Sequence, residues 1–210
     1  MTSRSIARLL AVPVIIALAT TGAARAEQLG GESLVAALRQ GGYVLVMRHT
    51  SSPTARPAKE AADPENTNRE RQLDQAGRDT ARAMGEAFKK LGIPVGSVLS
   101  SPTYRALETV RLAAFGHAEA HAEIGDGGQS MQKIEGSPIE WLRAKAAEAP
   151  QSGTNTVIVT HMPNIMASFG DSANGIEDGE AMVFRPDHKG GTELVARVKV
   201  EQWPTLANHQ

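Results

Sequence analysis

Three short runs of apolar residues are typical of strands that are buried on both faces. They lie at positions 42–47, 95–99 and 156–160. Such strands are expected in the middle of a sheet that is covered by helices on each side. Two later runs, 181–185 and 194–200, also have the composition of strands. The residues between these last two are rich in turn formers, which predicts a hairpin.

Longer segments between the strands have helical patterns. From Gln75 to Leu91, apolar side chains recur every three or four positions and make one helical face. Pro102 follows two serines, which predicts a helix capped by serine, with the proline in its first turn, that runs toward Ala114. Ser137 and Pro138 repeat this signal. The alternation of strands and helices predicts an α/β protein, a three-layer α/β/α sandwich with a mostly parallel central sheet.

The segment 50–72 is the one long irregular stretch, and it is rich in proline and polar residues. Loops of this length inside compact domains are usually functional or disordered. The sequence shows no internal repeat and no sign of a second domain.

The first 26 residues have the layout of a secretory signal peptide, with arginines before an apolar run from Leu9 to Leu18 and small residues before the expected cleavage site. We therefore expect a mature domain over residues 27–210 and a periplasmic or secreted location. The apolar run is about half of the roughly 20 residues that span a bilayer. Pro13 also interrupts it, so we expect no membrane anchor after cleavage.

Charge and cysteine content exclude several function classes. Loss of residues 1–26 would leave 19 Lys and Arg against 23 Asp and Glu, a net charge of −4 instead of −1. Without clustered basic residues, we expect no nucleic acid partner. There is no cysteine, so disulfides and thiolate chemistry are excluded. His117 and His121 would suit a shared metal on a helix, but on the predicted strand they lie roughly 13 Å apart. We expect neither a metal nor a cofactor.

Basic side chains follow three of the predicted strands at the sheet edge where α/β proteins bind ligands. The first strand ends in Arg48 and His49, the second leads to Arg105 in the next helix, and the third ends in His161. If these strands are neighbours, the four side chains and one or two helix N-termini face one pocket. Guanidinium groups and helix N-termini both bind phosphate, which predicts a phosphate site.

Four motifs in this order resemble those of the histidine phosphatase superfamily, which has the phosphoglycerate mutase-like fold. They are VLVMRHT, QLDQAGR, SSPTYRALET and VIVTHM, between positions 44 and 162. The resemblance implies that His49 is a nucleophile that becomes phosphorylated, and that Arg48, Arg105 and His161 bind the phosphoryl group of a small phosphorylated substrate. Within the family, the chain looks closest to small secreted members that resemble the lipopolysaccharide core heptose phosphatase.

Two positions differ from the family pattern. Thr50 stands where the family has glycine, which narrows the backbone approach to the pocket, and Met162 stands where it has Gly or Asp. The lack of Asp after His161 argues against the acid phosphatase branch, so the proton donor stays open. The candidates are Asp126, Glu123 and Glu180. If none reaches the pocket, the enzyme should prefer good leaving groups such as phosphohistidine or acyl phosphates.

Other interpretations stay open at this point. The same pocket could belong to a module that binds phosphate without turnover, and a periplasmic protein that binds metal through histidines is a third possibility. Thr109 is expected only to support Arg105 from the same helix. Arg69 and Arg71 are either solvated charges or, because their loop borders the active site in this fold, contacts for the part of the substrate beyond the phosphate.

Overall fold

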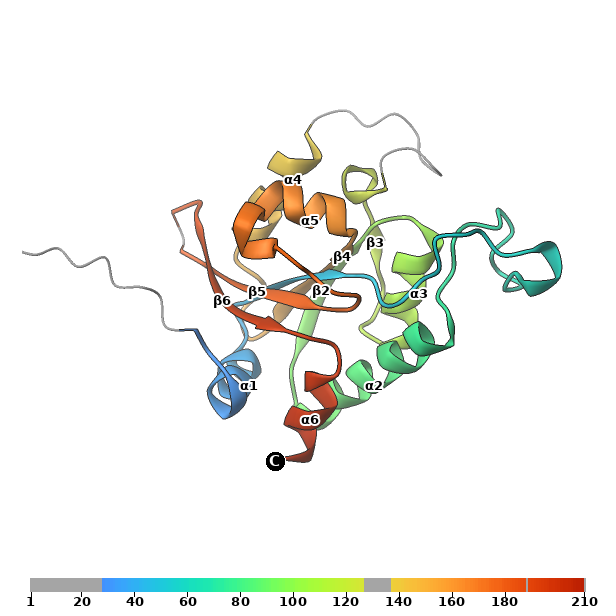
Figure 1. Cartoon of the computed structure of the whole chain (residues 1–210). Helices are drawn as coiled ribbons and strands as arrows, with labels where there is room; N and C mark the ends of the chain where they lie inside the picture. Colours follow the sequence, from blue (N-terminus) through green and yellow to red (C-terminus); the bar gives the residue numbers. More distant parts are fainter. Residues whose placement is uncertain (1–27, 127–136, 188, 210) are drawn as a thin grey trace, which may run out of the picture.

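The protein has one six-stranded sheet between two layers of helices (Figure 1). The computed structural model describes residues 28–126, 137–187 and 189–209, so the expected signal peptide lies outside the described residues. The strand order is β3-β2-β4-β1-β5-β6. The strands are β1 (Val44–Arg48), β2 (Val95–Ser100), β3 (Glu119–Ala120), β4 (Asn155–Thr160), β5 (Ala181–Pro186) and β6 (Thr192–Val198).

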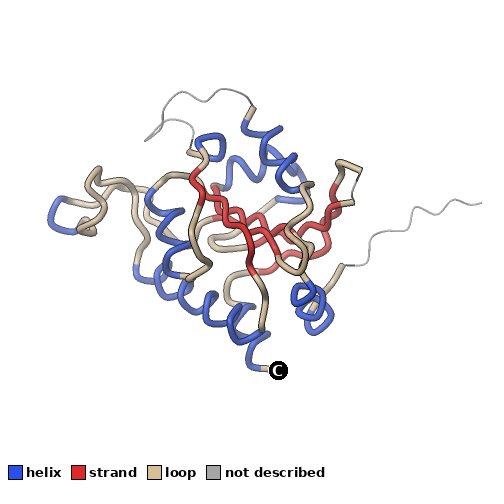
Figure 2. Tube along the Cα trace, turned by 180° about the vertical axis from the view of Figure 1, so that it is seen from behind, coloured by secondary structure: helices blue, strands red, loops and turns tan. Residues whose placement is uncertain are grey.

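Within the described residues, six α-helices cover the sheet, which Figure 2 shows from behind. They are α1 (Gly31–Gln40), α2 (Gln75–Leu91), α3 (Tyr104–Leu112), α4 (Pro138–Ala146), α5 (Met162–Phe169) and α6 (Gln202–Asn208). One core cluster joins the sheet to α1, α2, α3 and α6, and a second joins its other face to α4 and α5. The expected three-layer α/β/α sandwich is therefore confirmed. Across the described part of the chain, no helix is both long and apolar enough to cross a membrane.

The central strand β1 shows why its sequence is apolar throughout. Leu45 and Met47 pack in the first core cluster, while Val44 and Val46 pack in the second. All four side chains are fully buried. A strand that lies between two helical layers must be apolar at both odd and even positions.

The pairing of the central strands brings their carboxyl ends to one edge. β1 and β2 both pair in parallel with β4, whereas β5 and β6 are antiparallel. Arg48 pairs with Thr160, and Ser100 pairs with Val159. The segments that follow β1, β2 and β4 therefore leave the sheet side by side.

The predicted helix over Gln75–Leu91 is confirmed. Asp74 caps it by accepting the N–H of Gly77 at 2.7 Å, and Gly92 ends it in the left-handed conformation with φ of 66°. The helix predicted after Ser137 is confirmed as α4, and the Ser137 hydroxyl accepts the N–H of Glu140.

The predicted start of α3 is wrong. The helix begins at Tyr104 rather than with Pro102 in its first turn, and no side chain of the preceding serines caps it. Instead, the carboxylate of Glu70 accepts the N–H of Tyr104 at 3.0 Å. This cap comes from a residue 34 positions away, which a local pattern does not show. Two helices, α1 and α6, were not predicted.

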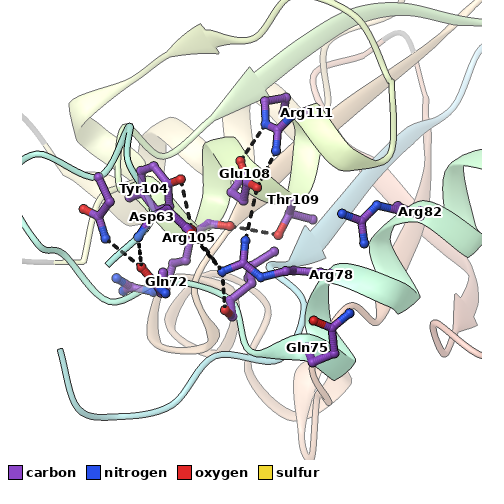
Figure 3. A network of polar contacts seen from close by, with 12 residues as sticks. Asp63, Gln72, Gln75, Arg78, Arg82, Tyr104, Arg105, Glu108, Thr109 and Arg111 are labelled. Atoms are coloured by element: carbon purple, nitrogen blue, oxygen red, sulfur yellow. Dashed lines mark hydrogen bonds and ion pairs between the residues drawn. The ribbon is translucent and has the colours of Figure 1, made fainter. Parts of the chain in front are cut away.

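The segment 50–72 extends from the body of the protein and has a single 3₁₀ turn, Lys59–Ala61 (Figure 1). Asp63, in the middle of this segment, binds both α2 and α3. Its carboxylate accepts hydrogen bonds from Arg78 of α2 at 2.9 Å and from the Tyr104 hydroxyl of α3 at 3.1 Å (Figure 3). Arg78 also lies 3.5 Å from Glu108. The loop thus returns to the body close to the N-terminus of α3.

Candidate active site

A cavity of about 320 Å³ opens at the carboxyl ends of β1, β2 and β4. Its lining comes from the ends of β1 and β4, from the first turns of α3 and α5, and from two loops. The lining residues are Arg48, His49, Arg71, Arg105, Asp126, His161, Met162, Pro163 and Asn164. The structure thus places the two arginines and two histidines from the sequence prediction around one space.

His49 follows β1 and is held at both ring nitrogens. Nδ1 lies 2.8 Å from the carbonyl oxygen of Thr50, and Nε2 lies 3.1 Å from Nε of Arg105. A carbonyl oxygen only accepts and a guanidinium only donates, so the proton is on Nδ1 and the lone pair is on Nε2. The site therefore holds a neutral imidazole with its unprotonated nitrogen beside a cation.

His161 follows β4, and in its ring the roles of the two nitrogens are exchanged. Its Nδ1 accepts a hydrogen bond from Nη2 of Arg105 at 3.1 Å, while Nε2 donates to the Ser101 hydroxyl at 2.8 Å. The two imidazole rings lie 5.2 Å apart between centroids. Each ring thus directs its acceptor nitrogen toward the same guanidinium group.

Burial is the main reason why both imidazoles are neutral. It lowers the pKa of His49 from its ordinary value of 6.5 to about 3, and the charges of Arg105 and Arg48 act in the same direction. The hydrogen bond to Thr50 acts against this lowering. Burial, followed by Arg105, lowers the pKa of His161 to about 2. At neutral pH, both rings are bases rather than cations.

Arg105 connects both histidines to Asp126. Its Nη2 lies 3.1 Å from Oδ2 of Asp126, and both side chains are almost completely buried. The other carboxylate oxygen, Oδ1, is buried and has no hydrogen-bond partner among the residues that the structure describes. The backbone just before Asp126 is held by Asn164, whose amide donates to the carbonyl of Gly125 at 2.8 Å.

Two further arginines line the cavity. Arg48 binds the carbonyl of Ile176 at 3.2 Å and Asp178 at 2.7 Å. Arg71 donates to the carbonyls of Pro53 and Ser52, at 2.7 and 3.1 Å. Burial, and then the charge of Arg105, lowers the pKa of Arg71 below its usual range. Three guanidinium groups therefore face one small cavity, which favours an anionic ligand.

The family follows from a match over residues 44–174, more than half of the chain, to the model of the histidine phosphatase superfamily, branch 1. The chain belongs to the histidine phosphatase superfamily. No curated protein matches it. The sheet and its helical layers match the phosphoglycerate mutase-like fold of this superfamily.

Solved structures of low sequence identity share the fold. The protein histidine phosphatase SixA in complex with tungstate is 16% identical, with a TM-score of 0.57 over 76% of this chain and 98% of that one. A putative phosphohistidine phosphatase SixA from Agrobacterium tumefaciens is 17% identical, with a TM-score of 0.51 over 76% and 98%. A putative alpha-ribazole-5'-P phosphatase from Escherichia coli is 14% identical, with a TM-score of 0.51 over 73% and 95%.

Of the three acids considered from the sequence, the structure brings only Asp126 to the cavity of this histidine phosphatase fold. Glu180 is buried, but its carboxylate binds Arg197 at 2.7 Å and the N–H of Glu177 at 2.9 Å. The expectation that Glu180 could reach the pocket is therefore wrong. Glu123 lies in a 3₁₀ turn and does not line the cavity.

The two departures from the family motifs lie in different places. Thr50 is fully buried, and its hydroxyl lies 3.3 Å from that of Thr109 rather than in the cavity. The expected narrowing of the pocket by Thr50 is therefore not seen. Met162 does line the cavity and is 39% exposed, at the first position of α5.

The two expected helix N-termini differ at their first residues. The first residues of α5, including Asn164, line the cavity, whereas the N–H of Tyr104 in α3 is already bound by Glu70. Asn164 was not singled out from the sequence, and its only local signal is its place after Pro163 in the first turn. No cluster of three or more metal-binding side chains is found among the described residues.

Proposed function

We propose that this chain is a phosphatase that hydrolyses phosphomonoesters in two steps through a phosphohistidine at His49. One observation supports this most strongly. The lone pair of His49 Nε2 lies in a cavity with three arginines, while the opposite nitrogen is fixed by the Thr50 carbonyl. A fixed neutral base beside positive charge is what attack on a phosphate dianion requires.

In the first step, Nε of Arg105 releases Nε2 of His49, Nε2 forms a bond to phosphorus, and the bond from phosphorus to the leaving oxygen breaks. Arg105, Arg48 and Arg71 stabilise charge on the phosphoryl oxygens, and the N-terminus of α5 adds backbone N–H groups. In the second step, water attacks phosphorus and gives a proton to the Asp126 carboxylate, and the bond to Nε2 breaks. Phosphate leaves, and His49 returns to its neutral form.

Asp126 is the proton donor in this proposal. In the free protein its carboxylate is paired with Arg105. A phosphate dianion that binds Arg105 brings like charge next to the carboxylate, which favours the protonated acid. Oδ1, which no other described residue binds, then delivers the proton to the leaving oxygen.

Export and the substrate class are also part of the proposal. The layout of residues 1–26 supports secretion to the periplasm or beyond. The sequence resemblance to lipopolysaccharide core heptose phosphatase suggests a phosphorylated sugar as one substrate to test. Sequencing the N-terminus of the protein recovered from a periplasmic fraction checks the export, and a start at Glu27 is expected.

The test of the enzyme is hydrolysis of p-nitrophenyl phosphate by wild type, His49→Ala and His117→Ala. His117 is exposed and lies outside the cavity, so its variant is a matched histidine control. We expect activity in wild type and in the control, and none above background in His49→Ala. Equal rates in all three would refute the role of His49.

The role of Asp126 is tested by comparing leaving groups. Asp126→Asn should lose on the order of 100-fold in kcat with an alkyl phosphate, because an alkoxide needs a proton. With p-nitrophenyl phosphate, whose leaving group departs as an anion, the loss should be much smaller. Equal losses on both substrates would show that Asp126 does not act as the acid.

A phosphate-binding module without turnover is the alternative function. The ion pair between Asp126 and Arg105 favours it, because a carboxylate that stays paired donates no proton. This alternative predicts that wild type and His49→Ala bind inorganic phosphate and that neither hydrolyses p-nitrophenyl phosphate or an acyl phosphate.

A further inference from the structure

Thr109 lies one helical turn after Arg105 on the buried side of α3, and its hydroxyl is fully used. The hydroxyl donates to the carbonyl of Arg105 at 2.9 Å, and it accepts a hydrogen bond from the backbone N–H of Thr50 at 3.2 Å. The hydroxyl of Thr50 lies 3.3 Å from it. A hydroxyl has one donor and two acceptor positions, so Thr109 satisfies all three at once.

These bonds close a circuit between the two residues that act on the phosphate. The carbonyl of Thr50 holds Nδ1 of His49, and Nε of Arg105 donates to Nε2 of the same ring. Thr109 links the backbones of these two residues, because its hydroxyl binds the N–H of Thr50 and the carbonyl of Arg105. We call the set of His49, Thr50, Arg105 and Thr109 the hydrogen-bond circuit.

Thr50 is also confined from its other side. A Cβ added to Gly179 would lie 3.1 Å from Cγ2 of Thr50, so the methyl group packs closely against that glycine. Gly179 has φ of 72°, a conformation that favours glycine. Thr50 therefore lies between the Thr109 hydroxyl and the backbone of Gly179, and both contacts restrict the residue whose carbonyl holds His49.

Loss of the Thr109 hydroxyl would leave the N–H of Thr50 without a partner in a fully buried place. An unpaired buried donor is costly, so the segment should shift to satisfy it. The shift would move the carbonyl that orients His49. A misplacement of about 1 Å in a reacting group can cost about 100-fold in rate.

We propose that Thr109 is a positioning residue for catalysis, which deepens and rests on the proposed phosphatase function. Its hydroxyl fixes the His49 ring with the proton on Nδ1, and it ties that ring to the backbone of Arg105. Thr109 does not line the cavity, so it acts only through these two residues. The sequence alone suggested no more than support of Arg105 within the helix.

The kinetic test compares Thr109→Val, Thr109→Ser and Thr80→Val. Thr80 makes the same kind of helical bond, to the carbonyl of Ala76 at 2.8 Å, but in α2 and outside the cavity. In Thr109→Val, kcat for p-nitrophenyl phosphate should fall about 100-fold, with KM and the Kd for inorganic phosphate within twofold of wild type. Thr109→Ser should recover kcat to within about threefold, and Thr80→Val should match wild type.

The second readout needs no turnover. Nitrogen-15 NMR of the His49 ring should show a single Nδ1–H tautomer in wild type, Thr109→Ser and Thr80→Val, and a mixture in Thr109→Val. If wild type hydrolyses nothing, the phosphatase proposal fails while the tautomer still tests the circuit. If wild type is active and Thr109→Val keeps both its kcat and a single tautomer, the positioning role fails alone.

Thermal unfolding separates positioning from instability. All three variants should be folded at the assay temperature. If the Thr109→Val protein does not fold, Thr109→Ala takes its place. Equal loss of kcat in Thr109→Ser and Thr109→Val would mean that packing, not the hydroxyl, matters, and this result would overturn the proposal.

Discussion

One histidine follows β1 and another follows β4. A comparison of these two histidines shows how the groups around each ring give it a different role. Both rings are buried, and both accept a hydrogen bond from Arg105. His49 has a backbone carbonyl at Nδ1, which only accepts, whereas His161 has the Ser101 hydroxyl at Nε2, which can donate or accept. The proton of His49 is therefore fixed by the backbone itself.

This difference favours His49 as the nucleophile on physical grounds. Attack through Nε2 leaves a positive ring whose Nδ1–H still donates to the Thr50 carbonyl, so the charge is stabilised as it forms. His161 has its acceptor nitrogen turned to Nη2 of Arg105. Attack through this nitrogen would leave an N–H that faces the Ser101 hydroxyl instead of a backbone carbonyl, so the new charge would be less well stabilised.

The largest expected effect is on kcat, and it tests directly which of the two histidines is the nucleophile. His49→Ala should lose on the order of 10⁵-fold in kcat because the nucleophile is gone. His161→Ala should lose about 10²-fold to 10³-fold, because one group that stabilises the transition state is lost. Single-turnover kinetics with p-nitrophenyl phosphate measures both. A larger loss in His161→Ala than in His49→Ala would reverse the assignment.

The next effect concerns the group that both rings share. Arg105→Lys keeps the positive charge but cannot bind His49 through Nε and both His161 and Asp126 through Nη2. We expect kcat/KM to fall about 100-fold. Steady-state kinetics checks this, with Arg82→Lys as the exposed control in α2. If Arg105→Lys retains wild-type kcat/KM, the guanidinium geometry is unimportant.

A smaller effect appears in the pH dependence of stability. Both histidines have a pKa lowered from 6.5, to about 3 for His49 and about 2 for His161. The unfolded chain therefore binds more protons below pH 6.5, and stability falls as the pH drops from that value. Each ring should cost about 1.4 kcal/mol per pH unit in this window.

Urea unfolding at pH 7 and pH 5 measures this dependence. The loss of unfolding free energy between the two pH values should be about 2 kcal/mol smaller in His49→Ala than in wild type, and similarly for His161→Ala. The exposed control His117→Ala should show the wild-type loss. Identical pH dependence in all four proteins would show that the two rings are not buried as neutral bases.

The smallest effect on activity is expected at Glu180, beside the end of β1. Its backbone carbonyl accepts the N–H of Arg48 at 3.2 Å, while its side chain is turned to Arg197. Glu180→Gln should leave kcat/KM within twofold of wild type and lower the free energy of unfolding by about 1 to 3 kcal/mol. A large loss of activity without a loss of stability would indicate that Glu180 is the proton donor after all.

The fold was largely predictable because its signals are local. The helix over Gln75–Leu91 has a cap, a regular apolar face and a terminal glycine, and strand β1 is apolar on both faces. The short helix α6 has only seven residues, with Pro204 in its first turn. Its stability comes from Trp203, which packs on Phe88 of α2 with ring centroids 4.6 Å apart, and this tertiary contact has no local pattern.

The candidate site was predictable where residues directly follow strands. The position of Arg48, His49 and His161 depends only on the parallel order of β1 and β4. Glu180 was misjudged because β6 pairs beside β5 and brings Arg197 to its carboxylate. Arg71 was left open because its place depends on how a long loop folds back onto the carbonyls of Ser52 and Pro53.

The central claim is that Nε2 of His49 forms the bond to phosphorus. The most direct measurement is to quench the enzyme under denaturing alkaline conditions during turnover of a phosphorus-32 substrate, and to locate the label. We expect acid-labile label on the peptide with His49, attached to Nε2, because Nδ1 is held by the Thr50 carbonyl. Label on His161, on Nδ1 of His49, or on no residue during rapid turnover would contradict this account.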